Sequence, residues 1–451
     1  MMAKTKKRVV TRKGKPAASS GKFNFSQSMI PKSCNGRPEG VFLEEFRNKA
    51  WQAYEKMDLP QTTEEAWRRT DIAALKTESF KVAGEADGTL PPVPEKLLEP
   101  LAGESHGGQI TLTTAGAEVY LDTSLEEQGV VFTDFRAACR EHGQLLQKMI
   151  GQIVKYDEDK FSAMAAALAQ NGVLLYVPKG VQIEQPLHSV LWGPGKALAH
   201  FSHILVWLEE GASATYVHEY ASPTESDQSM HSGIVEIHVA PSAKLVFVEL
   251  QSWGEQVWNF THERAVVGRD GRLDWIFGAI GSRLTKNFSE IDLVGQGAEG
   301  RMSGFYFTDG VQHLDHDTQQ NHNAPNTTSD LLFKGALKDK SRSVWQGMIY
   351  VAPGAQKTDG YQSNPNLVLS EEARADSIPG LEIQADDVRC THGATVGKID
   401  ENEVFYLQSR GIPQAEAEQL IVEGFFDPIM QRIPFTRVRE RLQQSIVDKL
   451  E

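Results

Sequence analysis

Residues 173–395 contain a unit that repeats at a nearly constant interval, and this period restricts the fold more than any single motif does. In each unit a short run of β-branched and aromatic residues ends at a turn of small residues, and a second such run follows. The first four turns, which are 30, 30 and 26 residues apart, lie at Gly211, Pro241, Gly271 and Gly297. A period of this length indicates stacked repeats, because one unit cannot bury its apolar face until a neighbour covers it.

Two fold classes use units of this kind. Short strands joined by small-residue corners form a β-helix, whereas the local alternation at Leu245 and Phe247, and at Trp275 and Phe277, also fits an antiparallel sandwich. The near-constant spacing favours the stack. We therefore predict a mainly β fold with a right-handed parallel β-helix (β-solenoid) core over residues 171–397, flanked by N-terminal and C-terminal α-helical domains.

The segment before the core has a helical period. Phe42, Phe46, Ala50 and Tyr54 recur four residues apart, as side chains on one face of a helix do. We predict an N-terminal helical region over residues 39–170. The region is also expected to contain a linker, two stretches of short strand and a further helical run, at residues 83–108, 109–122, 129–133 and 136–169.

The chain returns to a helical period after the core. Asp400 and Glu403 are spaced as in a capping box, and Gly411 followed by Pro413 marks a stop and a restart. We predict a C-terminal helical domain over residues 398–451 that caps the solenoid. Its apolar residues exceed what one buried face needs, so docking of a partner protein is an equally good interpretation.

Charge is unevenly distributed along the chain. The net charge is −14, yet residues 1–22 contain eight Lys or Arg and no acid. We predict that residues 1–38 form a basic disordered tail, with a nucleic-acid arm or an organelle-targeting peptide as alternatives. The acidic remainder lacks the clustered positive charge that nucleic acid requires, and no apolar run reaches the roughly 18 residues that span a membrane.

The cysteines bear on the compartment. Cys34, Cys139 and Cys390 are odd in number and far apart, which argues against a disulfide framework and for a reducing environment. We therefore predict a cytoplasmic protein. Cys390 stands apart from the other two because it precedes His392 by two residues.

Cys390 and His392 are the candidate metal ligands. In an extended strand, side chains two apart leave the same face, so the thiolate and the imidazole would project together while Arg389 and Thr391 face away. Such ligands suit iron, zinc or an iron–sulfur cluster, but these sites usually need about four protein ligands, which one strand cannot supply. The alternative is that Cys390 is a small buried hydrophobe and His392 a hydrogen-bonded turn residue.

A second stretch, residues 312–325, is rich in histidine and acids. His313, Asp315 and Asp317 alternate onto one strand face, which is compatible with iron or zinc. Stacked rungs also favour ladders of polar side chains that bond to one another. We expect this structural role rather than a metal site.

Several motifs in the chain resemble those of a known family. Residues 354–376 and 381–397 are similar to the core signature of the SufB/SufD family, the SUF iron–sulfur cluster assembly proteins. Residues 334–347 and 405–412 belong to the same pattern, and residues 64–70 resemble the acidic-Trp-basic-Thr motif that precedes the family core. The resemblance covers nearly the whole chain apart from its basic N-terminal tail.

Within the family, three features resemble the SufD type rather than the SufB type. This chain has Cys390-Thr-His392-Gly-Ala where SufB-type proteins carry Glu-His-Glu-Ala. Ser363 follows Gln362 at the position where SufB holds its key cysteine. The Cys-rich N-terminal motif of some SufB proteins is also absent from the sequence.

The resemblance implies a non-catalytic subunit, not an enzyme, that works with a SufB paralogue and the ABC-type ATPase SufC. In the family the β-helices of the two paralogues pair edge to edge, and the C-terminal helices grip the ATPase. A transient iron–sulfur cluster would form at the paired interface, with His392 as the matching ligand, Cys390 as a possible one and the missing thiolate supplied by SufB. The alternatives are a purely structural partner of SufB, a SufB-type scaffold, and a stand-alone solenoid enzyme that cleaves polysaccharide.

Overall fold

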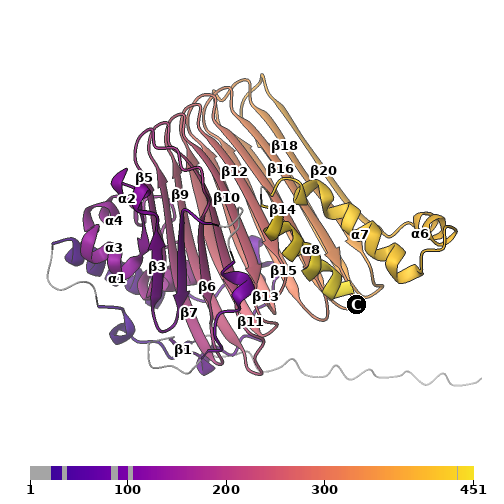
Figure 1. Ribbon diagram of the computed structural model, residues 1–451, viewed down its shortest axis with the longest axis horizontal. Helices are drawn as coiled ribbons and strands as arrows, with labels where there is room; N and C mark the ends of the chain where they lie inside the picture. Colours follow the sequence, from indigo (N-terminus) through magenta and orange to yellow (C-terminus); the bar gives the residue numbers. More distant parts are fainter. Residues whose placement is uncertain (1–21, 33–37, 83–89, 100–104, 434, 451) are drawn as a thin grey trace, which may run out of the picture.

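The repeat found in the sequence corresponds to the turns of a parallel β-solenoid in the computed structural model (Figure 1). The structure describes residues 22–32, 38–82, 90–99, 105–433 and 435–450. Successive strands alternate between two sheets, so each strand of the solenoid pairs in parallel with the strand two places further along the chain. The predicted mainly β solenoid with helices towards both termini is confirmed, and an antiparallel sandwich is excluded for the core.

The two sheets are named odd and even after their strands. The even sheet contains β6 (Leu187–Trp192), β8 (Ser213–Ala221), β10 (Lys244–Ser252), β12 (Arg272–Ala279), β14 (Glu299–Thr308), β16 (Thr328–Leu337), β18 (Asp359–Val368) and β20 (Arg389–Lys398), with β2 (Gly108–Thr113) and β3 (Ala117–Leu121) at its N-terminal end. The odd sheet contains β5 (Asn171–Val177), β7 (Leu198–Leu208), β9 (Ser229–Val239), β11 (Val257–Val267), β13 (Leu284–Leu293), β15 (His313–His322), β17 (Arg342–Val351) and β19 (Arg374–Ile383), with β4 (Val131–Asp134) at its N-terminal end and β1 (Lys81–Val82) beside β7.

The corners between strands explain the regular spacing of small residues. Gly211 and Gly297 have φ angles of 69° and 73°, a left-handed conformation that glycine adopts without steric cost. At the two intervening corners the left-handed residues are Ser242 and Asp270, each one position from the turn residue that the sequence indicated. The period in the sequence therefore records where the chain crosses from one sheet to the other.

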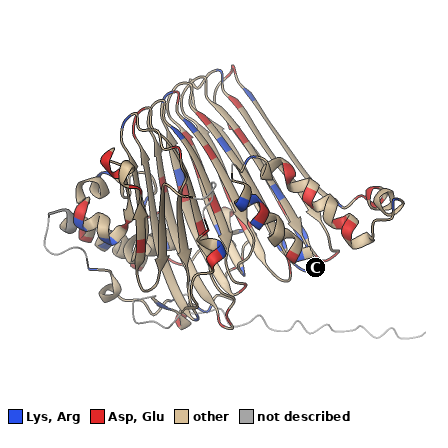
Figure 2. Cartoon of the chain, viewed as in Figure 1, with Lys and Arg blue, Asp and Glu red and all other residues tan. Residues whose placement is uncertain are grey.

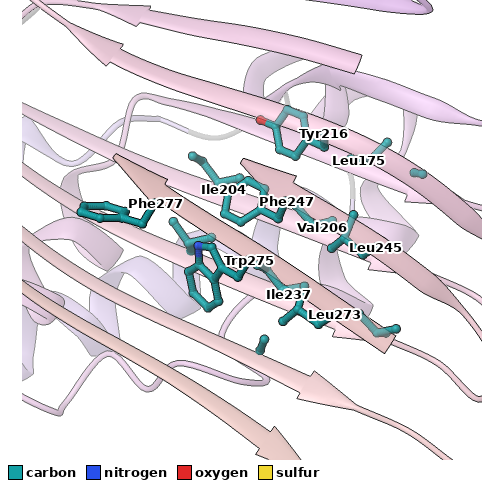
Figure 3. Packing of buried hydrophobic residues seen from close by; sticks show 14 of the residues in the cluster. Leu175, Ile204, Val206, Tyr216, Ile237, Leu245, Phe247, Leu273, Trp275 and Phe277 are labelled. Carbon is teal, nitrogen blue, oxygen red and sulfur yellow. The ribbon is translucent and has the colours of Figure 1, made fainter. Parts of the chain in front are cut away.

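Inward-facing side chains of both sheets form the core of the solenoid (Figure 3). The labelled members of this cluster are Leu175, Ile204, Val206 and Ile237 from the odd sheet, and Tyr216, Leu245, Phe247, Leu273, Trp275 and Phe277 from the even sheet. Every second residue of a strand points inward, which gives the same local alternation as a sandwich strand. Burying each large apolar side chain stabilises the fold by about 1.5–3 kcal/mol, so the stack as a whole is strongly held together.

Helices of the N-terminal region cover the outer face of the odd sheet. They are α1 (Pro38–Lys56), α3 (Phe135–Glu141), α4 (Gly143–Met149) and α5 (Lys160–Leu168), with single 3₁₀ turns at Gln27–Met29, Glu65–Trp67 and Thr77–Ser79. The short helix α2 (Thr123–Glu127) instead adds Leu125 to the solenoid core, and the 3₁₀ turn Glu95–Leu97 packs Leu97 against the even sheet. The periodic residues Phe46, Ala50 and Tyr54 of α1 are buried in this layer. The helical run expected at 136–169 is divided into three helices. The expected basic tail and linker fall partly outside the described residues, at 1–21, 33–37, 83–89 and 100–104.

The C-terminal helices do not cap the solenoid, contrary to the expectation from the sequence. Of α6 (Glu401–Gln408), α7 (Gln414–Met430) and α8 (Thr436–Leu450), the last two lie along the outer face of the even sheet, and α6 projects away from it (Figure 1). Phe426 packs against Phe305 with ring centroids 5.6 Å apart. Arg441 of α8 reaches Glu219 of β8 at 2.5 Å. The apolar residues of these helices therefore pack against the outer face of the even sheet, and the last rung of the solenoid stays uncovered.

Helices α6 and α7 carry acidic residues and no Lys or Arg, whereas α8 carries residues of both signs (Figure 2). Among the described residues, no helix is both long and apolar enough to cross a membrane.

Two of the cysteines can be described. Cys390 is a free thiol, whereas Cys139 is buried in α3 and is disulfide-bonded. Cys34 lies outside the described residues. The bonded Cys139 removes the argument for a reducing compartment that rested on the number and spacing of the cysteines.

Candidate metal site at the open end of the solenoid

The last rung of the solenoid has no strand beyond it. Strands β19 and β20 are the terminal members of their sheets, each paired on one side only, with β17 and β18 respectively. Most residues of β20 are exposed, in contrast to the buried strands of the middle rungs. An unpaired edge of this length offers a row of backbone N–H and C=O groups to another chain.

Cys390 and His392 lie on the same face of β20, as their spacing predicted. Their partners in the register are Gly360 and Gln362 of β18, both of which are buried and face the interior. The Gln362 side chain crosses the interior, where its Nε2 donates to the carbonyl oxygen of Gly380 at 2.9 Å. The two candidate ligands therefore extend the interior face of the even sheet onto the uncovered rung.

The surroundings of Cys390 are mostly apolar. Its side chain packs against a small cluster that includes Ile349, Val351 and Ala355. Burial raises the pKa of the Cys390 thiol, an effect that a backbone hydrogen bond from Gly360 partly offsets. The thiol of the isolated chain is therefore protonated at neutral pH, and it would act as a ligand only after a metal displaces its proton.

His392 is exposed, so its ring is accessible from outside the chain. The structure thus contradicts the alternative in which His392 is a hydrogen-bonded turn residue, because it lies within strand β20. Cys390 is only half-buried, which leaves part of its side chain accessible as well.

Thiol and imidazole are suitable donors for an iron–sulfur cluster, but they form only half of a ligand set. No group of three or more His, Cys, Asp or Glu side chains within the described ranges is placed to hold a metal ion. Ser363, the neighbour of Gln362 on β18, has a hydroxyl group and pairs with Gly393. The geometry therefore fits a cluster only if a second chain contributes ligands across the open edge.

The second acidic and histidine-rich stretch forms β15 and is held by a buried lysine. Lys286 Nζ lies 3.1 Å from Asp315 Oδ1 and 3.6 Å from Asp317 Oδ2. His313 Nε2 lies 3.0 Å from the hydroxyl of Thr70, and burial lowers the pKa of His313 to about 3. The ammonium group occupies the position between the carboxylates that a metal would need. This arrangement is the ladder of mutually bonded polar residues that the sequence led us to expect.

The same cluster explains the motif at residues 64–70. Trp67 is buried and stacks on Phe161 at 5.7 Å, and Lys286 Nζ lies 5.8 Å from the centre of its indole ring. Thr70 donates a hydrogen bond to Asp315. The motif therefore fastens the N-terminal region to the odd sheet over strands β11 to β15.

Two further polar groups in the structure were not predictable from the sequence. Lys286 belongs to an otherwise ordinary strand, and its burial follows only from the packing of Trp67 above it. Glu249 of β10 and Glu263 of β11 face each other inside the solenoid. Only the alternation of inward and outward positions, read together with the exact register, would have identified this pair.

The structure defines a class of protein with a parallel β-solenoid whose uncovered last rung carries a thiol and an imidazole, and with a helical layer on its flank. Family models support this class: the SufBD core domain of the SUF FeS cluster assembly system matches residues 192–425, and the SufBD N-terminal region matches residues 106–188. The chain belongs to the SufBD family of iron–sulfur cluster assembly proteins.

Relatives from staphylococci agree with this assignment. The chain is 29% identical over 426 residues to the iron-sulfur cluster assembly SufBD family protein of Staphylococcus saprophyticus, covering 91% of this chain and 90% of the relative. The corresponding proteins of Staphylococcus epidermidis and Staphylococcus aureus match at the same identity and coverage. The similarity thus extends over the N-terminal region, the solenoid and the C-terminal helices.

Proposed function

We propose that this chain is the SufD-type subunit of a SUF assembly complex. In this proposal its open end pairs with a SufB-type paralogue, and a nascent iron–sulfur cluster is held transiently at the paired edge. His392 supplies one imidazole ligand and the paralogue supplies the missing thiolate. The observation that carries the proposal is the exposed His392 on the interior face of a last rung that lacks a neighbouring strand.

The cluster is cargo in this proposal, so the chain performs no catalysis itself. ATP hydrolysis belongs to a SufC-type ATPase that binds the C-terminal helices. Support for this contact comes from Phe405 and Tyr406 of α6, which are 70% and 56% exposed, and from Leu420 of α7 at 43%. Large exposed apolar side chains on a projecting helix and on the helix that follows it are typical of a docking surface. We propose a cytoplasmic location because the free thiol of Cys390 persists in a reducing medium.

The proposal is tested with the purified complex of this chain, its paralogue and the ATPase. His392→Ala should leave assembly intact by size-exclusion chromatography but reduce the iron and sulfide retained after anaerobic reconstitution. Thr391→Ala, the adjacent exposed change on the opposite face of β20, is the matched control and should retain the full cluster. A full cluster yield with His392→Ala would contradict ligation by this residue.

A second candidate function is a purely structural partner that recruits the ATPase without touching iron. It is favoured by the lack of any three-ligand group among the described residues. The same experiment separates the two functions, because a structural partner tolerates both His392→Ala and Cys390→Ala. Purification of a self-paired chain that holds a cluster without a paralogue would instead indicate a SufB-type scaffold.

A further inference from the structure

Arg69 is held at the open end of the solenoid by buried neighbours on both sides in the sequence. Trp67 stacks on Phe161, and Thr70 donates to the buried carboxylate of Asp315. A hydrogen bond of 3.0 Å from the Thr70 amide to the Trp67 carbonyl closes the turn between them. The backbone at Arg69 therefore cannot leave its position without breaking buried contacts, which fixes the point from which its side chain extends.

The guanidinium lies beside a shallow hollow at the unpaired edge. This hollow has a volume of about 410 Å³ and is lined by Arg69, residues 375–378 of β19 and residues 394–396 of β20. Both strands are the last of their sheets, so the hollow opens where a paired subunit would lie. A residue from the N-terminal motif is thus brought to the far end of the solenoid.

The hollow has more positive than negative charge. Asp376 is bound by Arg342 at 2.7 Å and by Arg374 at 2.9 Å. Burial opposes ionisation of Asp376, but hydrogen bonds from both guanidiniums hold its pKa below the usual range. Its carboxylate is therefore ionised and already paired with Arg342 and Arg374. The Nη1 atom of Arg69 is buried and has no hydrogen-bond partner in the part of the chain that the structure describes.

We propose that Arg69 binds a carboxylate side chain from the terminal strands of the paired subunit. The inference rests on the proposed pairing and identifies what the partner must offer there. A planar guanidinium holds a carboxylate through two parallel hydrogen bonds. Arg342 and Arg374 share Asp376 at this edge, and Arg69 lines the same hollow without an acid of its own, so the edge selects an acidic partner.

A second copy of this chain is a poor occupant of the hollow. In a symmetric pair the same surface meets itself, so Arg69, Arg342 and Arg374 of one copy would approach the same three arginines of the other. Like charges brought together at an interface suppress the wrong pairing. The excess charge therefore favours a paralogue that carries an acid over self-pairing.

The test measures the Kd of pairing between this chain and its SufB-type paralogue. Arg69→Met keeps the length of the side chain and removes its charge, and it should weaken pairing by about tenfold or more and reduce the salt dependence. The Kd of Arg69→Lys should lie between those of the unmodified chain and Arg69→Met, because lysine keeps the positive charge but lacks the planar guanidinium. Arg68→Met is the matched control, since Arg68 forms an exposed ion pair with Glu65 at 2.9 Å, and its Kd should stay within about twofold of the unmodified chain. An unchanged Kd for Arg69→Met would overturn the inference.

A further variant distinguishes failure of this inference from failure of the proposed function. Val396 lines the hollow and is 50% exposed, so Val396→Trp should fold normally and block pairing at this end by its bulk, without changing the charge. Pairing that survives Val396→Trp would mean that the edge is not the interface, which overturns both proposals. Pairing that is lost with Val396→Trp but unaffected by Arg69→Met would overturn only the role of Arg69. Thermal unfolding of each variant checks that the fold is retained.

Discussion

Lys286 and Asp315 form an ion pair of 3.1 Å on the odd sheet, and both side chains are fully buried beneath the N-terminal motif. A buried charge that loses its partner is left in a medium that solvates it poorly. This pair therefore couples the N-terminal region to the solenoid, because Thr70 and Trp67 contact the same cluster.

Replacing Lys286 with Met should destabilise the protein by about 3–5 kcal/mol, since Asp315 would remain buried without its counterion. Chemical denaturation followed by circular dichroism measures the change. The matched control is Arg272→Met, which removes an exposed ion pair with Glu299 of 3.5 Å and should cost at most about 1 kcal/mol. Equal losses in the two variants would show that burial does not matter at this pair.

The pair of carboxyl groups inside the solenoid should make stability depend on pH. Burial raises the pKa of Glu249 and of Glu263, and they are hydrogen-bonded to each other. The folded state then binds protons more tightly than the unfolded chain. The stabilising contribution is complete below the ordinary pKa of 4.5 and is lost as the pH rises through the raised pKa of the folded pair.

Glu249→Gln should reduce this alkaline loss, because an amide can donate to Glu263 without carrying a proton that titrates. Thermal unfolding between about pH 6 and about pH 9 compares the two proteins, and the melting temperature of the variant should fall less over that range. Glu372→Gln, the same change in an exposed ion pair with Lys340, should follow the unmodified protein. If the melting temperatures of all three proteins fell equally, the buried carboxyl pair would not be the cause of the pH dependence.

Phe426→Ala should detach the C-terminal helices from the even sheet. The variant removes the ring that packs on Phe305 and should cost about 3–5 kcal/mol of local stability. Hydrogen exchange should accelerate in α7 and α8 while strand β11 keeps its protection. Leu420→Ala, a change at an exposed position of α7, should alter exchange little. Faster exchange throughout the solenoid would contradict an independent helical layer.

In the proposed complex, Phe405→Glu should abolish binding of the ATPase without affecting pairing with the paralogue. The reason is that Phe405 is exposed on α6, a helix that projects away from the strands of the solenoid (Figure 1). Pull-down with each partner separately measures the two contacts. Val294→Glu, which introduces the same charge at an exposed apolar corner, serves as control and should bind both partners. Retained ATPase binding by Phe405→Glu would contradict docking on α6.

Cys390 should react slowly with iodoacetamide at neutral pH in the folded chain, because burial raises the pKa of its thiol above the ordinary value of 9.0. Mass spectrometry of the peptide that contains Cys390 measures the rate. The same residue in urea provides the comparison and should react faster. Equal rates in the two conditions would mean that the apolar cluster around the thiol does not protect it.

The sequence predicted the solenoid because its corners require small or left-handed residues at a fixed interval, as at Gly211 and Gly297. It also predicted the shared face of Cys390 and His392, since strand geometry alone determines it. The position of the C-terminal helices was not predictable in this way. Their apolar stripe shows that they bury one face, but whether that face meets the end or the flank depends on Phe305 and other outward residues of distant strands.

The placement of Arg69 was hidden for a similar reason. Its motif is recognisable as a short pattern around Trp67, yet nothing local shows that this turn lies beside β19, some 300 residues later in the chain. Long-range placement of this kind arises from the stacking of rungs, which converts position along the sequence into distance along the axis.

The uncovered last rung has a consequence for biosynthesis. A newly made chain exposes two adjacent strand edges that can template further strand addition, as the tip of a growing fibril does. Each rung added by a foreign chain would expose the next, so growth would not end by itself. In the proposed complex, the yield of native protein should therefore depend on how soon a paired subunit covers this edge, and expression of this chain alone should favour deposition in inclusion bodies.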